Sequence, residues 1–210
     1  MPFATTAKAE LPSSNKTVRQ KVVTAARRHF LAHGFRSVTM DDLAAELGMS
    51  KKTFYAHFPG KVALIEAVMR DKLASIEADL ERITTLRGVN FMDALHELLS
   101  CLQQHTGEIQ PAFLRDIRRD APEVFTLVEK SRAEIIERCF TRLLGDGRKS
   151  GMIRNDVPVR LVIEILLAAT HAIMNPAKLE QLNLTPRAGY SAILDVILRG
   201  VMTAKGREKL

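Results

Sequence analysis

The stretch TMDDLAAELGMSKKTFYAHFPGK, from Thr39 to Lys61, predicts two short helices joined by a tight turn. Thr39 can cap the first helix, and the two aspartates that follow place negative charge in its first turn, where the helix dipole favours it. Gly48 supplies the left-handed backbone that ends this helix, and Ser50 can cap the second one. We therefore expect a helix-turn-helix.

The second of these helices opens on positive charge, which opposes the helix dipole. That cost makes sense if the helix end faces phosphates and base edges, because a recognition helix presents its N-terminal residues to the major groove of DNA. Lys51 and Lys52 can reach phosphates or the acceptor atoms of guanine, and Thr53 can offer its methyl group to thymine. Phe54 and Phe58 fit a core better. The stretch therefore predicts a DNA-reading helix.

The same residues resemble the N-terminal domain of the TetR family of bacterial regulators, whose members carry a run much like SKKTFYAHFPGK after a glycine-containing turn. The resemblance covers roughly Val18 to Val68. It implies phosphate contacts near the helix-turn-helix and a groove-facing start of the second helix. Many members have a small residue where Lys52 stands, so its charge adds either a phosphate or a guanine contact. The residues expected at DNA are Thr39, Ser50, Lys51, Lys52, Thr53, Tyr55, His57 and Lys61.

The distribution of charge supports this interpretation without the family. Residues 1–61 contain ten Lys and Arg against four Asp and Glu, which is +6 of the net charge of +7. The remaining residues are nearly neutral, with 21 basic against 20 acidic side chains. Binding of a polyanion therefore belongs to the front of the chain.

Apolar residues recur every three or four positions from Val18 onward, so we expect an all-α fold. The 210 residues, 46% of them hydrophobic, suffice for a small domain joined to a larger one. We predict a mobile arm over residues 1–15, a three-helix DNA-binding domain over 16–61, and a helical effector-binding and dimerisation domain over 62–210. Beyond the first three helices, others are expected at about Lys61–Leu86, Phe91–His105, Gln110–Arg119, Pro122–Lys149, Pro158–Asn175 and Pro186–Lys205.

No segment has the pattern of a membrane anchor or a secretion signal. The first fifteen residues lack the unbroken apolar run of a signal peptide. The longest apolar run, from Leu161 to Met174, is interrupted by Glu164 and His171 and is too short to cross a bilayer. We therefore expect a cytoplasmic protein without a membrane partner.

The last two long helices carry broad apolar bands, which an outer helix of a monomer would not need. They either meet their copies across a two-fold axis or form the inside of one subunit. The resemblance implies a four-helix dimer interface from these helices, and hence a near-palindromic operator with half-sites about 34–36 Å apart. The expected interface residues are Leu161, Ile165, Ala168, Ile193, Ile197 and Val201.

The resemblance also implies an effector domain between the connector helix and the dimer helices. Its ligand would be a small and largely apolar molecule, although a packed core accounts for the same residues. The candidate wall residues are Leu99, Gln103, Phe113, Ile117, Val128, Ile135 and His171.

We expect neither a metal nor a cofactor. Cys101 and Cys139 lie in helical segments without the Cys/His spacing of a zinc finger, which suits core thiols in a reducing compartment. His105 and His171 have no evident carboxylate or thiolate partner in the sequence.

The sequence predicts a dimeric, sequence-specific DNA-binding transcriptional regulator, and the resemblance implies a ligand-responsive repressor. The alternative is a constitutive or architectural DNA-binding dimer with a solid rear core. An enzyme with a helix-turn-helix appendage ranks last, because the chain has no nucleophile elbow, phosphate loop or HExxH run.

Overall fold

The computed structural model of the chain describes residues 13–85 and 90–209. This described part is helical, and its one β-type pairing is an isolated bridge between Ile153 and Met202. The predicted all-α fold is confirmed. The helices are α1 (Ser13–His33), α2 (Met40–Glu46), α3 (Lys51–His57), α4 (Lys61–Thr85), α5 (Phe91–Gly107), α6 (Pro111–Asp120), α7 (Pro122–Lys149), α8 (Val159–Ile173), α9 (Pro176–Gln181), α10 (Pro186–Val201) and α11 (Ala204–Arg207).

Three differences from the predicted helices exceed a shift of one or two residues at an end. α1 begins at Ser13, inside the segment predicted as a mobile arm, and residues 1–12 lie outside the described residues. The prediction of one helix from Pro186 to Lys205 is wrong, because Met202 adopts extended backbone and separates α10 from α11. α9 has no counterpart among the predicted helices, although Asn175 caps it through its side chain.

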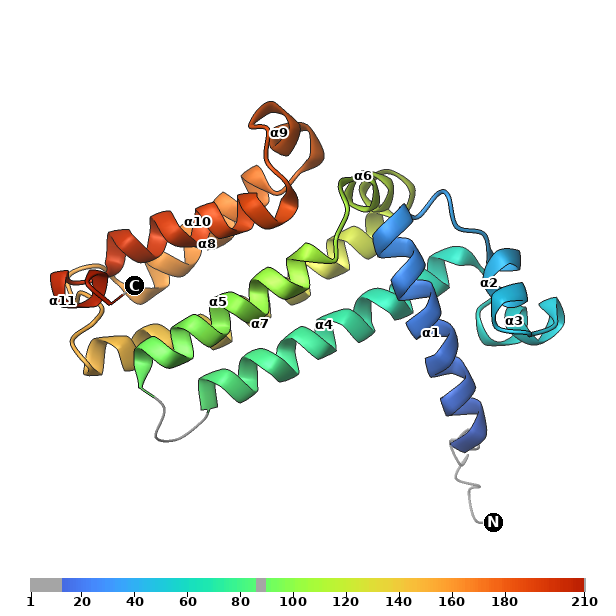
Figure 1. Cartoon of the computed structure of the whole chain (residues 1–210), viewed down its shortest axis with the longest axis horizontal. Helices are drawn as coiled ribbons and strands as arrows, with labels where there is room; N and C mark the ends of the chain where they lie inside the picture. Colours follow the sequence, from blue (N-terminus) through green and yellow to red (C-terminus); the bar gives the residue numbers. More distant parts are fainter. Residues whose placement is uncertain (1–12, 86–89, 210) are drawn as a thin grey trace, which may run out of the picture.

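Figure 1 shows α1, α2 and α3 grouped at one end of the molecule, with the long helix α4 leading away from them. α4 packs along α5 and α7, and α8 and α10 cover the other side of that pair. α6 lies against α1 at the junction between the front group and the rear bundle. No helix in the described residues is long and apolar enough to cross a membrane.

The packing of the two apolar cores does not follow the predicted domain boundary after residue 61. The front core contains buried side chains of α1, α2, α3 and the first half of α4, and it is closed by Phe113 and Ile117 of α6 together with Ala121 and Val124. The rear core is built from the second half of α4 with α5, α7, α8 and α10. The front three helices therefore do not bury their apolar surface by themselves.

Polar contacts fix α6 on the end of α1 and on the loop that leads into α2. The Gln110 amide donates to the Leu31 carbonyl at 3.2 Å, and the Arg36 amide donates to the Asp116 carboxylate at 2.9 Å. Gly34 has φ +88°, and a Cβ on it would lie 2.9 Å from the same carboxylate. Only glycine fits both this backbone and this close approach.

A buried charge lies where the two cores meet. Lys72 of α4 is 1% exposed, and its ammonium donates to the Glu108 carboxylate at 2.7 Å. Arg27 of α1 donates to the same carboxylate at 3.0 Å. Burial lowers the pKa of Lys72. Burial alone would raise the pKa of Glu108, but the hydrogen bonds from Lys72 and Arg27 lower it. This group holds α1, α4 and the end of α5 together.

Replacing Glu108 with Gln should lower the free energy of unfolding at pH 7 by about 2–3 kcal/mol, because it leaves the Lys72 charge buried without a counter-ion. The loss is smaller than for a fully buried pair because the Glu108 side chain is 38% exposed. Since folding lowers the pKa of Glu108, its stabilisation is present above about pH 4.3 and is lost as the pH falls through the folded-state pKa. Denaturant unfolding should therefore show the two proteins converging at acid pH.

The matched control is Glu97→Gln, since Glu97 pairs with Arg82 at 2.8 Å and both side chains are exposed. Its loss should stay below about 1 kcal/mol. Equal losses in the two variants would contradict the assigned role of Lys72.

Candidate DNA interface and ligand cavity

The turn between α2 and α3 has the predicted geometry. Thr39 caps α2 by accepting from the Asp42 amide, and Ser50 caps α3 by accepting from the Thr53 amide, both at 3.1 Å. Gly48 has φ +62°. The amides of Gly48 and Met49 donate back to carbonyls of α2, which forms a Schellman ending. Because nothing lies within 4 Å of the position of a Cβ on Gly48, the backbone angle alone requires glycine here.

α3 turns one face to the core and the other outward. Phe54 is fully buried and Phe58 is almost so, as predicted. Lys51, Lys52 and Thr53 are exposed at the start of the helix, and the Tyr55 ring is 43% exposed. Thr39 and Ser50 are exposed at the helix starts, and His57 is half-buried. Seven of the eight residues expected at DNA thus lie on α3 or at the start of α2 or α3.

Lys51 has a carboxylate partner in the free protein. Its ammonium donates to Asp41 of α2 at 2.5 Å, and this hydrogen bond raises the pKa of Lys51. The ion pair is exposed, so it contributes little stability and the lysine can exchange Asp41 for a phosphate. The pair places the cation at the adjoining starts of two helices, whose dipoles favour an anion there.

Lys61 lies differently from the other expected DNA contacts. Its ammonium is 4.6 Å from the centre of the Phe35 ring and donates to the Arg36 carbonyl at 3.3 Å. Burial lowers its pKa, against the opposing effect of Asp116 and Asp120. In this conformation Lys61 ties the start of α4 to the loop before α2, and a phosphate contact requires the side chain to leave that place.

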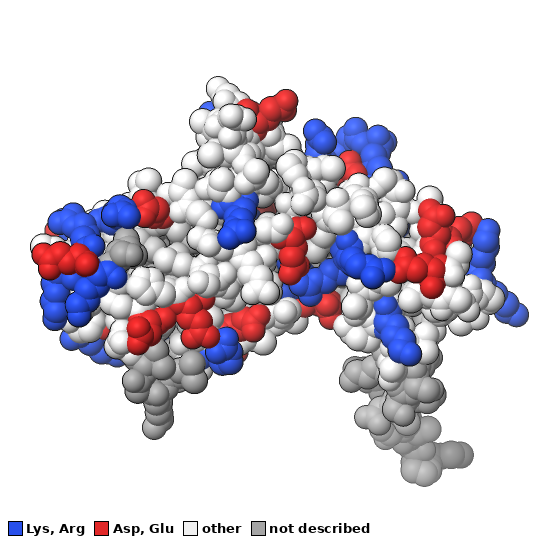
Figure 2. Space-filling view, viewed as in Figure 1, with Lys and Arg blue, Asp and Glu red and all other residues white. Residues whose placement is uncertain are grey.

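Figure 2 shows basic and acidic side chains together at the end of the molecule that carries α2 and α3. The acids there include Asp41, which pairs with Lys51, and Glu46, which pairs with Arg28 and His29. The front of the chain is therefore basic in sum while several of its cations are paired.

Comparisons with known proteins identify this arrangement. The family model for bacterial regulatory proteins of the tetR family matches residues 22–68. The transcriptional regulator UidR of Escherichia coli K12 is 27% identical over 190 residues, which cover 89% of this chain and 93% of UidR. The solved structure of Salmonella enterica GusR is 25% identical, covers 92% of this chain and 98% of GusR, and superposes with a TM-score of 0.59. The SmeT–triclosan complex has the same fold at 18% identity and a TM-score of 0.65, over 90% of this chain and 93% of SmeT.

The chain belongs to the TetR family. It is accordingly a helix-turn-helix DNA-binding transcriptional regulator, and the matched residues 22–68 include α2 and α3.

In this TetR-family chain a cavity of about 110 Å³ lies in the rear core and reaches the front core at Met69 and Val128. Its walls come from α4, α5, α7 and α10 and are largely apolar. Burial raises the pKa of the Tyr190 hydroxyl, one of the polar groups in the wall, to about 12. The lining residues are Met69, Lys72, Leu73, Ile76, Leu80, Leu102, His105, Thr106, Val128, Arg132, Ile135, Ile136, Met174 and Tyr190.

Two of the seven expected wall residues, Val128 and Ile135, line this cavity. Phe113 and Ile117 do not, because α6 turns its apolar face to α1 and fills the front core. Leu99 packs against the rear core, and Gln103 accepts from Arg187 at 3.5 Å.

The seventh expected wall residue, His171, has a 72% exposed side chain and pairs with Glu129 at the surface. The inward positions of α5 are instead Leu102 and His105, which an apolar pattern over one helix does not distinguish from their neighbours.

The expected dimer residues divide into two groups. Leu161 and Ile165 of α8 are 50% and 48% exposed, and Ala168 is exposed one turn further on. Ile193 and Val201 of α10 are buried in the rear core of their own subunit. Ile197 is half-buried against that core. Val196, at 72% exposure, is the outward-facing apolar residue of α10 that the sequence interpretation missed.

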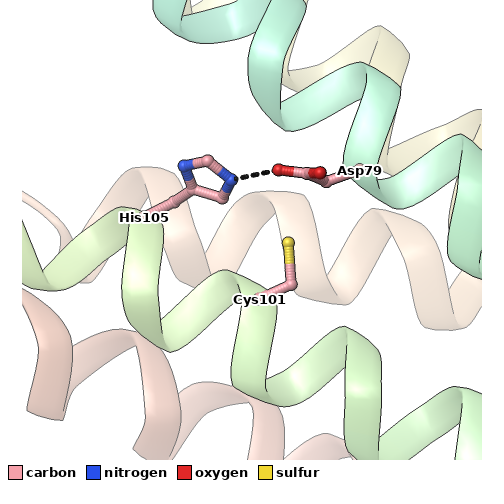
Figure 3. A group of neighbouring side chains, drawn as sticks. All are labelled: Asp79, Cys101 and His105. Carbon is pink, nitrogen blue, oxygen red and sulfur yellow. Dashed lines mark hydrogen bonds and ion pairs between the residues drawn. The ribbon is translucent and has the colours of Figure 1, made fainter.

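A cluster of three polar side chains lies beside the cavity, between α4 and α5 (Figure 3). His105 Nε2 is 3.0 Å from an oxygen of Asp79, and the Cys101 sulfur lies next to them. The expectation that His105 has no thiolate or carboxylate partner is wrong, since Cys101 lies one helical turn before it on α5 and Asp79 contacts it from α4. Burial, with the charge of Asp79, raises the pKa of Cys101 to about 11.

Replacing Lys51 with Ala should weaken binding of random-sequence duplex DNA and flatten its salt dependence. Each lost phosphate contact reduces the slope of log K against log salt by about 0.9 per reading head. Fluorescence anisotropy over a range of salt concentrations measures both effects. The matched control is Lys149→Ala, because Lys149 is also exposed and also pairs with an aspartate, Asp146, at 2.8 Å. Equal changes in both variants would contradict a phosphate contact by Lys51.

Proposed function

We propose that this regulator is a ligand-responsive repressor that binds a near-palindromic operator as a homodimer in the cytoplasm. The observation that carries the proposal is the position of the cavity, in the rear core at the place where it meets the core of the helix-turn-helix. Met69 of the front core and Leu73 of the rear core, one turn apart on α4, both line it. A molecule in the cavity would therefore act on both cores at once.

The proposed operator contacts are the exposed residues at the helix-turn-helix. Lys51, Lys52 and Thr53 would face the major groove, and the helix starts at Thr39 and Ser50 would receive phosphates. Tyr55 and His57 would donate to phosphate oxygens beside them. Lys61 would join them if its side chain leaves the Phe35 ring.

The proposed dimer contact is an exposed apolar stripe on α8 beside α10. Leu161, Ile165 and Ala168 stand at helical spacing and leave apolar surface in solvent, which a monomer has no reason to keep. Val196 stands outward on α10, which packs on α8. The exposed small residues Ala192 and Gly200 lie one turn to either side of it and let a second copy approach closely.

Replacing Ile165 with Glu should convert the dimer to a monomer, because it would bury a charge at the two-fold contact without a partner. Sedimentation at micromolar protein concentration measures the state. Leu182→Glu is the matched control, since Leu182 is 44% exposed just after α9, outside the stripe, and this variant should remain a dimer. A wild-type monomer, or a dimeric Ile165→Glu variant, would refute the stripe as the interface.

The chemistry of the cavity favours an effector with an apolar body and one polar group. In the described residues three buried side-chain nitrogens lack a hydrogen-bond partner, and two of them, His105 Nδ1 and Arg132 Nε, belong to cavity residues. In the tautomer that donates from His105 Nε2 to Asp79, Nδ1 is an acceptor, whereas Arg132 Nε is a donor. A hydroxyl or amide group, which both donates and accepts, suits this pair.

The coupling to DNA would pass through helices that both cores share. Val128 of α7 lines the cavity and packs against both cores. At its N-terminal end α7 follows α6, which is bonded to the loop before the helix-turn-helix. A ligand that fits one arrangement of α4, α6 and α7 better than another would change the spacing of the two reading helices. Shifting that balance from 1:99 to 99:1 needs about 5.5 kcal/mol of differential affinity.

Benzyl alcohol and toluene probe the effector site as a matched pair, since they differ by a hydroxyl group. A cavity of roughly 150 Å³ holds benzene, so either probe needs a modest expansion here. At ten times its Kd benzyl alcohol should raise the melting temperature by about 3–6 °C. Toluene at the same concentration should raise it by less, because it binds more weakly. The difference should vanish in Arg132→Met. Equal shifts with both probes would show that His105 Nδ1 and Arg132 Nε do not bind the hydroxyl group of the probe.

The small size of the cavity favours a second candidate, a constitutive DNA-binding dimer without effector. Its volume of about 110 Å³ is below the range usual for ligand sites. Selection from a random duplex pool, followed by release assays with small compounds, separates the two. An enriched palindrome that no compound releases supports the constitutive protein, and release by a compound that raises the melting temperature supports the repressor.

A further inference from the structure

The group formed by Asp79, Cys101 and His105 offers three different metal ligands at one point between α4 and α5. The carboxylate oxygen, the sulfur and an imidazole nitrogen all lie within 4.8 Å of one another. Figure 3 shows Asp79 projecting from α4 toward the two side chains of α5. The group is part of the packed helix interface, since His105 is buried and Cys101 is half-buried.

We propose that this group is a site for a divalent zinc ion. Zinc binds Cys sulfur, His nitrogen and carboxylate oxygen, usually with four ligands in a tetrahedron. In such a site neighbouring ligand atoms lie about 3.3–3.6 Å apart, as follows from zinc–ligand distances of 2.0–2.3 Å. The observed 3.0 Å between His105 Nε2 and Asp79, and the upper limit of 4.8 Å, bracket that spacing. Small rotations of the three side chains would place an ion between them.

The helices hold the ligands in register without help from an ion. Cys101 and His105 stand at positions i and i+4 of α5, so both point from the same face. Asp79 lies in the second half of α4, whose neighbours Leu80 and Ile83 are fixed in the rear core. An ion would therefore require only side-chain rotations, because folding has already fixed the backbone of both helices.

Of the two His105 nitrogens, Nε2 faces Asp79 and would hold the ion, whereas the unpaired Nδ1 does not. His105 is 8% exposed and its Nδ1 is buried without a partner. A histidine held solely by an aspartate would leave this acceptor unsatisfied inside the protein, at a cost of about 1–3 kcal/mol. With the metal on Nε2 the hydrogen moves to Nδ1, which belongs to a residue of the cavity wall and would need an acceptor from a molecule bound there.

The fourth position has a candidate on the same helix. Glu97 is one turn before Cys101, and in the free protein its carboxylate accepts from Arg82 at 2.8 Å. Arg82 is the cation that zinc would have to compete with, since its positive charge acts on Cys101. Binding releases the thiol proton to solvent, so that Cys101 enters as thiolate, and either water or Glu97 completes the tetrahedron.

An ion at this place would cross-link α4 to α5. α4 begins at Lys61, beside the proposed reading helix. The ion would therefore affect the position of α4, as a ligand in the cavity would. This regulatory consequence rests on the proposed function, whereas the binding of the ion does not.

The test is a titration of the reduced, chelator-stripped full chain with Co²⁺, which replaces zinc and reports on its ligands. We expect one ion per chain, with visible bands of a tetrahedral ion and a near-ultraviolet band from thiolate-to-cobalt charge transfer, all displaced by Zn²⁺. Cys101→Ser should lose the charge-transfer band and weaken binding by more than the roughly 10–100-fold that loss of an outer partner costs. Asp79→Asn should weaken binding and keep that band.

Cys139→Ser is the matched control, because Cys139 is the other free cysteine and is buried in the rear core. It should bind Co²⁺ as the wild type does. No spectral change in the wild type, or an unchanged charge-transfer band in Cys101→Ser, would overturn the site.

A separate measurement decides whether the ion regulates. Anisotropy with duplex DNA, in chelator and in Zn²⁺, should show at least a fivefold change of Kd in the wild type and none in Cys101→Ser. Binding of Co²⁺ with an unchanged Kd for DNA would overturn the regulatory consequence and leave the ion a structural one. Failure to bind DNA under either condition would refute the proposed function while the cobalt spectrum still decides the site.

Discussion

The ammonium group of Lys72 lies inside the protein between the two apolar cores, and it is tolerated there because the Glu108 carboxylate accepts its hydrogen bond. The same carboxylate receives Arg27 of α1. A buried charge makes such a junction sensitive to geometry, since a shift that lengthens the contact leaves the charge uncompensated. The front and rear of this regulator are thus joined by a contact that tolerates few relative positions, which is what transmission of a small change requires.

α4 and α6 also connect the front and rear cores. α4 gives its first half to the front core and its second half to the rear one, and α6 closes the front core while its chain neighbours belong to the rear bundle. The cavity is lined by α4, α5, α7 and α10, and the Asp79, Cys101 and His105 group lies beside it. His105 belongs to both the cavity wall and this group. An ion on its Nε2 would therefore determine whether Nδ1, the other ring nitrogen, carries a hydrogen.

The local features of the reading unit could be predicted from the sequence because they depend on neighbouring residues. Thr39, Ser50 and Gly48 fix their caps and turn within a few positions along the chain. The cavity wall was predicted poorly, because which apolar side of a helix faces which core is decided by distant partners. Phe113 has the same pattern whether it lines a ligand site or plugs the front core. Of the predicted interface residues, Leu161 and Ile165 of α8 are exposed, whereas Ile193 and Val201 of α10 are buried in the rear core. A helix that is apolar on most sides does not reveal from its sequence which side faces outward.

The closing of the front core by α6 bears on how such regulators diversify. A head cut after residue 61 would leave behind the side chains of Phe113 and Ile117 that fill its interior, together with Asp116, which bonds the Arg36 amide. Recombination at the apparent domain border would thus join a head to a plug shaped for another sequence. The outward face of α3, which is the proposed reading surface, is smaller than the head and can change without disturbing the packed side of that helix.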